Sequence, residues 1–143
     1  MTVKTILAAK GGNVTTIEAI ATLSAAAGLL AKHRIGALIV CGADGRVTGI
    51  LSERDIVAAI AARGAAALDE TVGAVMTRKV ETCGQSETIG SIMERMTAGK
   101  FRHMPVVEQN RLIGVVSIGD VVKCRLEEIE RETAALRQYI LTA

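Results

Sequence analysis

The sequence has almost no aromatic side chains. Phe101 and Tyr139 are the only two, and tryptophan is absent from its 143 residues. Proteins that bind single-stranded nucleic acid stack the bases on exposed aromatic rings, so this composition argues against that class. The 17 basic and 15 acidic residues are intermixed, and no basic run forms a patch for DNA or for a membrane surface. We therefore expect neither nucleic acid nor membrane as a partner.

Cysteine is also scarce. Cys41, Cys83 and Cys124 are odd in number and widely separated, unlike the paired spacings of zinc sites and disulfide frameworks. Buried, reduced thiols are the simpler interpretation. The sequence shows neither a signal-peptide pattern nor an apolar run of the roughly 20 residues that span a bilayer. These features predict a soluble, cytoplasmic protein with no metal site.

Half of the residues are apolar, enough to build a core for one domain or for two small repeats. One motif occurs twice, 65 positions apart, as Gly49-Ile50-Leu51-Ser52-Glu53-Arg54-Asp55 and Gly114-Val115-Val116-Ser117-Ile118-Gly119-Asp120. Each copy is an apolar run that ends in Ser-x-x-Asp and is followed by an apolar helical pattern, which predicts a strand leading directly into a helix. Such a junction exposes free N–H groups and the positive end of the helix dipole, and therefore suits polar or anionic ligands.

A second interpretation of Ser-x-x-Asp requires no ligand. The pattern resembles a capping box, in which the serine side chain caps the N3 amide and the acid reaches back to the N-cap amide. A single copy would favour capping alone. Two copies inside a longer repeat favour a binding site.

The flanking segments follow the same order in both halves. Within residues 1–13, Val3, Ile6 and Leu7 predict a short amphipathic helix that Gly11 and Gly12 stop. The first half then predicts a β segment at 14–17, a helix at 19–31 capped by Thr22 or Ser24, a hairpin at 35–41 and 47–51, and a helix from 52 that Gly64 stops. The second half predicts a short helix at 71–76, a strand at 80–82, a helix at 88–98, a hairpin at 104–107 and 112–116, and a helix from 118. Aligning the halves pairs Val40 with Val107.

A β-α-β-β-α unit of this size cannot bury both faces of its sheet alone. We predict an α/β (α+β) fold in which two such units pack sheet to sheet about a pseudo-two-fold axis. Repeat 1 with its lead-in takes residues 1–66, repeat 2 takes 67–126, and a helical extension takes 127–143.

The last helix carries a heptad pattern. Alternating spacings of four and three residues define a seam of six apolar or small residues, namely Val122, Leu126, Ile129, Thr133, Leu136 and Ile140. The helix is longer than one repeat requires. Its far end is therefore expected to pack on a partner or, alternatively, to fold back on its own domain.

The order of elements and the doubled motif resemble a tandem pair of CBS domains, the Bateman module. Phe101-Arg102-His103-Met104-Pro105-Val106-Val107 and Val75-Met76-Thr77 carry further parts of the resemblance, which extends over residues 2–126. It implies a regulatory rather than catalytic ligand that contains adenosine, such as AMP, ADP, ATP, NAD(H) or S-adenosylmethionine. It also implies signalling to a regulated partner protein, and a homodimer.

The resemblance implies roles for particular residues. Asp55 and Asp120 would accept hydrogen bonds from ribose hydroxyls, and the serines of the two motifs would donate to ribose or phosphate. Arg54 and Arg102 would anchor phosphate, and we expect Asp120 with Arg102 and His103 to bind it more firmly. The predicted ligand-binding set is Thr16, Ile35, Gly36, Ala37, Ser52, Arg54, Asp55, Val80, Thr82, Arg102, His103, Met104, Pro105, Ser117 and Asp120.

The sequence is also compatible with other roles for two of these residues and with another function. His103 is equally compatible with a structural role, and Pro105 with shaping the entry to its strand. No Gly-x-Ser-x-Gly, Walker or His-Glu-x-x-His motif supports an enzyme. A structural dimerisation module with vestigial ligand sites is the alternative function.

Overall fold

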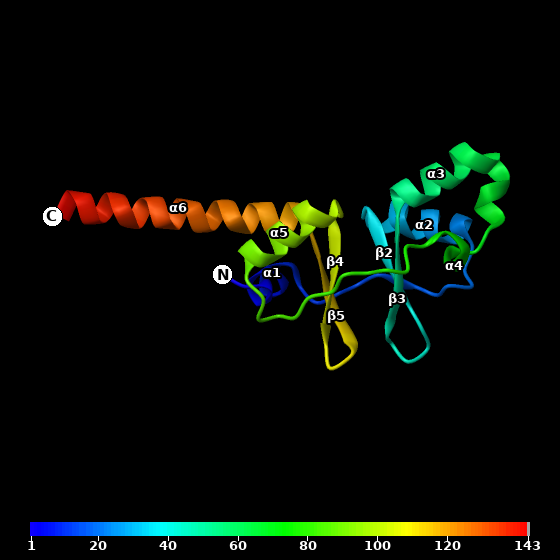
Figure 1. Ribbon diagram of the computed structural model, residues 1–143, viewed down its shortest axis with the longest axis horizontal. Helices are drawn as coiled ribbons and strands as arrows, with labels where there is room; N and C mark the ends of the chain where they lie inside the picture. Colours follow the sequence, from blue (N-terminus) through cyan, green and yellow to red (C-terminus); the bar gives the residue numbers. More distant parts are fainter. Residues whose placement is uncertain (143) are drawn as a thin grey trace.

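Two β-hairpins lie side by side at the centre of the computed structural model, which describes residues 1–142 (Figure 1). Strands β2 (Ala37–Cys41) and β3 (Val47–Ser52) pair antiparallel, and β1 (Thr16–Ile17) adds to β2 in parallel. Strands β4 (His103–Glu108) and β5 (Arg111–Ser117) form the second hairpin. The predicted mixed α/β architecture of two repeats is confirmed.

The helices surround the hairpins in the expected order. They are α1 (Val3–Lys10), α2 (Leu23–His33), α3 (Glu53–Arg63), the 3₁₀ helix η1 (Gly64–Asp69), α4 (Val72–Val75), α5 (Ile89–Gly99) and α6 (Ile118–Thr142). Thr22, Thr71 and Thr88 cap α2, α4 and α5, each accepting a hydrogen bond from the N–H three residues later. Gly64 ends α3 with a φ of 74°, which favours glycine and confirms its predicted role.

The strand registers define the internal symmetry. Ala37 faces Ser52 across the first hairpin, and His103 faces Ser117 across the second, so Ala37 and His103 occupy equivalent places. The same register makes Val40 equivalent to Val106, and the predicted pairing of Val40 with Val107 is wrong. The pairing of Val40 with Val107 implies a second hairpin turn that is two residues shorter than the first, whereas the registers show that it is one residue shorter.

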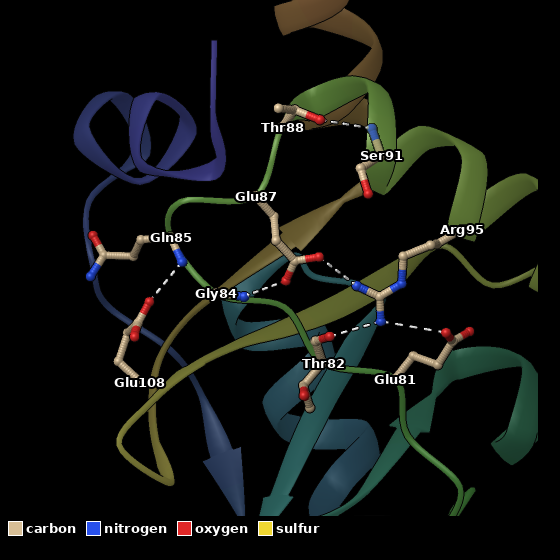
Figure 2. A network of polar contacts seen from close by, with 9 residues as sticks. All are labelled: Glu81, Thr82, Gly84, Gln85, Glu87, Thr88, Ser91, Arg95 and Glu108. Atoms are coloured by element: carbon tan, nitrogen blue, oxygen red, sulfur yellow. Dashed lines mark hydrogen bonds and ion pairs between the residues drawn. The ribbon is translucent and has the colours of Figure 1, made fainter.

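The predicted strand at 80–82 is also wrong. Only Cys83 forms a bridge, in parallel to Val106 of β4. The guanidinium of Arg95 reaches this segment from α5 and takes the place of a neighbouring strand, donating to the Thr82 carbonyl oxygen at 2.8 Å and to Glu87 at 2.9 Å (Figure 2). Arg95 thus holds the segment at Thr82, and backbone pairing with β4 is confined to Cys83, whose N–H and carbonyl oxygen bond to Pro105 and Val107.

The two hydrophobic cores exchange their lead-in helices. Val3 and Ile6 of α1 are buried in the core formed by α5, α6 and the second hairpin, whereas Val72 of α4 and the following Met76 belong to the core of α2, α3 and the first hairpin. Each repeat is thus completed by the segment that precedes the other repeat in the chain. This exchange joins the two halves, and the domain boundary at 66/67 stays a prediction.

Helix α6 extends away from both repeats (Figure 1). Val121 and Cys124 of its first turns are buried, and Glu128 contacts the Met1 amino group, but every residue from Ile129 to Thr142 is exposed. The alternative in which the helix folds back on its own domain is therefore wrong. No helix within residues 1–142 has the length and apolarity needed to cross a membrane.

Candidate functional site

A cleft of about 730 Å³ opens between the two repeats. The junction of β3 and α3 forms one wall, and the segment that enters repeat 2 forms another. The third wall is the connection from α5 to β4. The lining residues are Gly36, Ile50, Ser52, Glu53, Arg54, Asp55, Thr77, Lys79, Val80, Glu81, Gly99, Lys100, Phe101, Arg102 and His103.

Ser52 and Asp55 form a complete capping box at this junction. The Asp55 N–H donates to Ser52 Oγ at 3.2 Å, and the Ser52 N–H donates to Asp55 Oδ2 at 2.9 Å. Among residues 1–142, Asp55 Oδ1 accepts no protein hydrogen bond. The cap therefore explains the motif locally but leaves one carboxylate oxygen available to the cleft, where it can accept hydrogen bonds from hydroxyl donors.

Four basic residues line the cleft: Arg54, Lys79, Lys100 and Arg102. Across the described residues 1–142 none of them forms an ion pair, although Arg95, Arg63 and Lys10 do. Glu53, Asp55 and Glu81 are the acidic residues of the lining, so the cleft carries a small excess of positive charge. Unpaired guanidinium and ammonium groups around a concave surface favour an anionic ligand.

The second Ser-x-x-Asp junction repeats the capping geometry but has a different neighbour. Asp120 Oδ2 accepts the Ser117 N–H at 2.9 Å, and Lys10 at the end of α1 donates to the same oxygen at 2.7 Å. The lysine ammonium also donates to the Val115 carbonyl oxygen at 3.1 Å. Burial alone would raise the pKa of Asp120, but the hydrogen bonds from Lys10 and Ser117 outweigh burial and hold that pKa below its usual value.

His103 lies between the two junctions. It lines the cleft, faces Ser117 across the hairpin, and approaches Gly36 so closely that a Cβ on Gly36 would lie 3.4 Å from its Cε1. Burial lowers the pKa of His103, and the nearby Lys10 lowers it further, while Asp120 and Glu53 act in the opposite direction. The imidazole therefore favours its neutral form.

The structure brings together seven of the predicted site residues around the cleft: Gly36, Ser52, Arg54, Asp55, Val80, Arg102 and His103. It groups Arg102 with Asp55, whereas the sequence analysis associated it with Asp120. Ile35 lines a neighbouring groove between α2 and α3.

The remaining predicted residues lie outside the cleft lining. Met104 is fully buried in the second core, and Pro105 is buried beside it in β4. Thr16 and Thr82 are exposed, and Ala37 begins β2. Ser117 and Asp120 sit at the junction that Lys10 occupies.

Sequence reasoning missed Lys79 and Lys100 in the cleft and Lys10 at the second junction. Gly49 approaches Met76 as Gly114 approaches Leu7, so the segments after Met76 and Leu7 are equivalent, and Lys79 and Lys10 each follow three residues later. This repeated spacing of three residues is the sequence signal that identifies Lys79 and Lys10. It lies outside the Ser-x-x-Asp motif.

The thiols show no sign of activation. Burial, followed by the carboxylate of Glu87, raises the pKa of Cys83 to about 12, and burial also raises the pKa values of Cys41 and Cys124. Within residues 1–142, histidine, cysteine and acidic side chains form no cluster suited to a metal ion.

Two exchanged α/β repeats, each with a Ser-x-x-Asp junction at the end of its hairpin, define a tandem-repeat module with a cleft between its repeats. The family model of the CBS domain matches residues 4–62 and 72–127. The chain therefore belongs to the CBS-domain family and contains two copies of the domain.

Solved structures share this fold. The chain is similar to a CBS-domain-containing protein from Agrobacterium tumefaciens, with a TM-score of 0.83 and 48% identity, covering 87% of this chain and 92% of that one. It is also similar to the CBS domain pair of protein MJ0100, solved in complex with 5′-methylthioadenosine and S-adenosyl-L-methionine. That TM-score is 0.80 at 26% identity, covering 90% of this chain and 98% of that one.

Among curated relatives, the chain is 35% identical over 115 residues to the mitochondrial CBS domain-containing protein CBSX3 of Arabidopsis thaliana. The match covers 78% of this chain and 56% of the relative, so the chain spans little more than half of that protein's length.

Proposed function

We propose that this protein is a non-catalytic regulatory module that binds an adenosine nucleotide (AMP, ADP, ATP or NAD(H)) in the cleft between its repeats. Asp55 accepts hydrogen bonds from the ribose hydroxyls at its free oxygen Oδ1. Ser52 keeps its capping-box hydrogen bonds, which position Asp55. Ile50, Val80 and Phe101 supply apolar surface for the adenine ring.

The observation that carries the proposal is the set of four basic side chains at the cleft that form no ion pair among residues 1–142. Arg54 and Arg102 come from opposite repeats, so a phosphate held by both guanidinium groups joins the two halves. The excess of positive charge favours a phosphate-bearing ligand over the sulfonium of S-adenosylmethionine. The adenosine ligands of the MJ0100 domain pair support the nucleoside part of the proposal.

The proposal assigns one nucleotide site to each chain. Asp55 has an oxygen free, whereas the equivalent Asp120 is neutralised by Lys10. The Asp120 junction also lacks the two arginines of the cleft, because Gly119 replaces Arg54 and, by the strand register, Gly36 replaces Arg102. We therefore assign the nucleotide to Asp55, Arg54 and Arg102.

A nucleotide that contacts both repeats can act as a signal, provided that it binds two arrangements of the repeats with different affinity. A partner protein would detect the arrangement that the nucleotide stabilises. The proposal includes a homodimer and a reducing, cytoplasmic location, in keeping with the free thiols. It excludes catalysis by this chain.

Isothermal titration calorimetry with AMP, ATP, NAD, NADH and S-adenosylmethionine tests the proposal. We expect one phosphate-bearing ligand to bind with one equivalent per chain. Arg102→Ala should weaken that binding at least about tenfold, because it removes a charge-assisted contact to phosphate. Arg111→Ala is the matched control, since Arg111 is an exposed arginine at the hairpin turn, away from the cleft.

The alternative is a structural dimerisation module with vestigial sites. The complete capping boxes at both junctions favour it, because they account for Ser-x-x-Asp without a ligand. If none of the five compounds binds and Arg102→Ala behaves like the parent protein, this alternative is correct.

A further inference from the structure

The exposed half of α6 carries an apolar surface that its own domain does not cover. The exposed fractions are 55% for Leu126, 42% for Ile129, 60% for Leu136 and 63% for Ile140. The helix continues for 14 residues beyond Glu128, its last partly buried residue, a projection of roughly 21 Å at 1.5 Å per residue. Isolated helices of this length are marginally stable in water, so packing on a partner would stabilise this one.

We propose that α6 pairs in parallel and in register with α6 of a second copy of this chain, forming a two-stranded coiled coil. The seam consists of a positions Leu126, Thr133 and Ile140 and d positions Val122, Ile129 and Leu136. This inference is independent of nucleotide binding. The proposed function includes a homodimer without naming its interface, and this inference assigns that interface to α6.

The charges beside the seam fit a parallel second copy. In the parallel arrangement each g residue faces the e residue five positions later on the other helix. Arg125 then faces Glu130 of the second copy, and Glu132 faces Arg137. Each pair occurs twice by symmetry, which gives four contacts between opposite charges.

An antiparallel pair that covers the same seam brings like charges together. Glu130 would face Glu130, Glu132 would face Glu132, and Lys123 would face Arg137 of the other copy. A shift by one heptad relieves this repulsion but leaves Val122 and Leu126 uncovered. The charge pattern therefore favours the parallel arrangement.

The two repeats of each chain lie on a side of α6 that leaves the seam open to a parallel partner helix. The buried residues Val121 and Cys124 mark the side of α6 that faces its own repeats. At about 100° per residue, the seam lies roughly 130° around the helix from that side. In a parallel pair of α6 helices, the repeats of the two chains therefore project to opposite sides and do not cover the seam.

Sedimentation velocity of the full chain without nucleotide tests the pairing. We expect a dimer, and we expect the double variant Ile129→Glu/Leu136→Glu to weaken it at least about 100-fold, because both charges enter the apolar seam of each copy. The matched control is Ala134→Glu/Ala135→Glu, which adds the same charge to the same helix at exposed b and c positions and should remain dimeric. A monomeric parent chain, or a seam variant that stays dimeric, would overturn the proposal.

Cysteine cross-linking tests the orientation. In a Cys41→Ser background, Thr133→Cys at the central a position should form an intermolecular disulfide under mild oxidation, because a positions face each other in parallel pairs. Ala134→Cys should not. A dimer in which Thr133→Cys also fails to cross-link would contradict the parallel arrangement.

Discussion

The ammonium of Lys10 lies 2.7 Å from Oδ2 of Asp120, the same oxygen that accepts the Ser117 N–H. The equivalent Asp55 has no such partner, and its Oδ1 accepts no hydrogen bond among residues 1–142. Two copies of one motif thus have different electrostatic surroundings. The lysine that makes the difference comes from α1, which packs against the second repeat although it precedes the first in the chain.

Lys10→Ala should create a second ligand site. It leaves the Asp120 carboxylate without its cation and free to accept ribose hydroxyls, so we expect calorimetry with adenosine, which carries no phosphate, to detect a second, weaker binding event per chain. The unfolding free energy should change by less than about 1 kcal/mol, because the ion pair is partly exposed. Lys4→Ala, an exposed lysine on the same helix, is the control and should bind one equivalent. Two equivalents on the parent chain, or one on Lys10→Ala, would show that Lys10 does not close the site.

Stability should fall as the pH drops below about 6.5, the usual pKa of histidine. The pKa of His103 is lower in the folded protein than in the unfolded chain, chiefly through burial, so the unfolded chain binds more protons in this range. The stability is fully present above the unfolded pKa and is lost as the pH falls towards the folded pKa. Urea unfolding between pH 5 and 8 measures it.

His103→Gln should flatten that pH dependence, whereas His33→Gln, an exposed histidine at the end of α2, should not. An unchanged slope in His103→Gln would mean that another group is responsible.

Alanine in place of Gly49 should destabilise the protein more than alanine in place of Gly114. A Cβ at Gly49 would lie 2.5 Å from Met76 Sδ and 3.0 Å from the backbone oxygen of Thr77, whereas a Cβ at Gly114 would meet only the Leu7 side chain. A side chain adjusts more easily than backbone, so we expect a loss of about 1–3 kcal/mol at Gly49 and less at Gly114. Thermal unfolding compares the two; an equal or reversed order would contradict the close-approach explanation.

Arg95→Lys should loosen the segment that enters repeat 2. Lysine cannot reproduce the guanidinium contacts to Thr82, Glu87 and Glu81 that hold this segment (Figure 2). We expect a loss of about 1–2 kcal/mol in unfolding free energy and faster amide exchange at residues 80–87. Arg111→Lys is the exposed control. Unchanged exchange at residues 80–87 would mean that the backbone holds the segment without Arg95.

Local patterns predicted the hairpins and most helices well. Apolar runs on either side of turn residues identified the paired strands, and Thr22 and Gly64 were identified as a helix cap and a helix end. The predicted strand at 80–82 does not form, because Arg95, which lies outside the segment, donates a hydrogen bond to the Thr82 carbonyl oxygen. The exchange of α1 and α4 between the cores is a tertiary feature that no local pattern encodes.

The site was predicted less completely for the same reason. The doubled motif identified Asp55 and Asp120 but could not show that Lys10 reaches only one of them. Arg102 was associated with Asp120 because both belong to repeat 2 in sequence. In the folded chain, Arg102 lines the same cleft as Asp55.

Calorimetric titration of Asp55→Asn and Asp120→Asn with the preferred nucleotide tests the central claim most directly. Asparagine keeps the shape of each side chain but loses the charge, so each variant serves as the control for the other. The account predicts that Asp55→Asn weakens binding about 10- to 100-fold, as expected for hydrogen bonds to a charged group, and that Asp120→Asn leaves the affinity and the single equivalent unchanged. Equal losses in both variants, or a loss confined to Asp120→Asn, would contradict it.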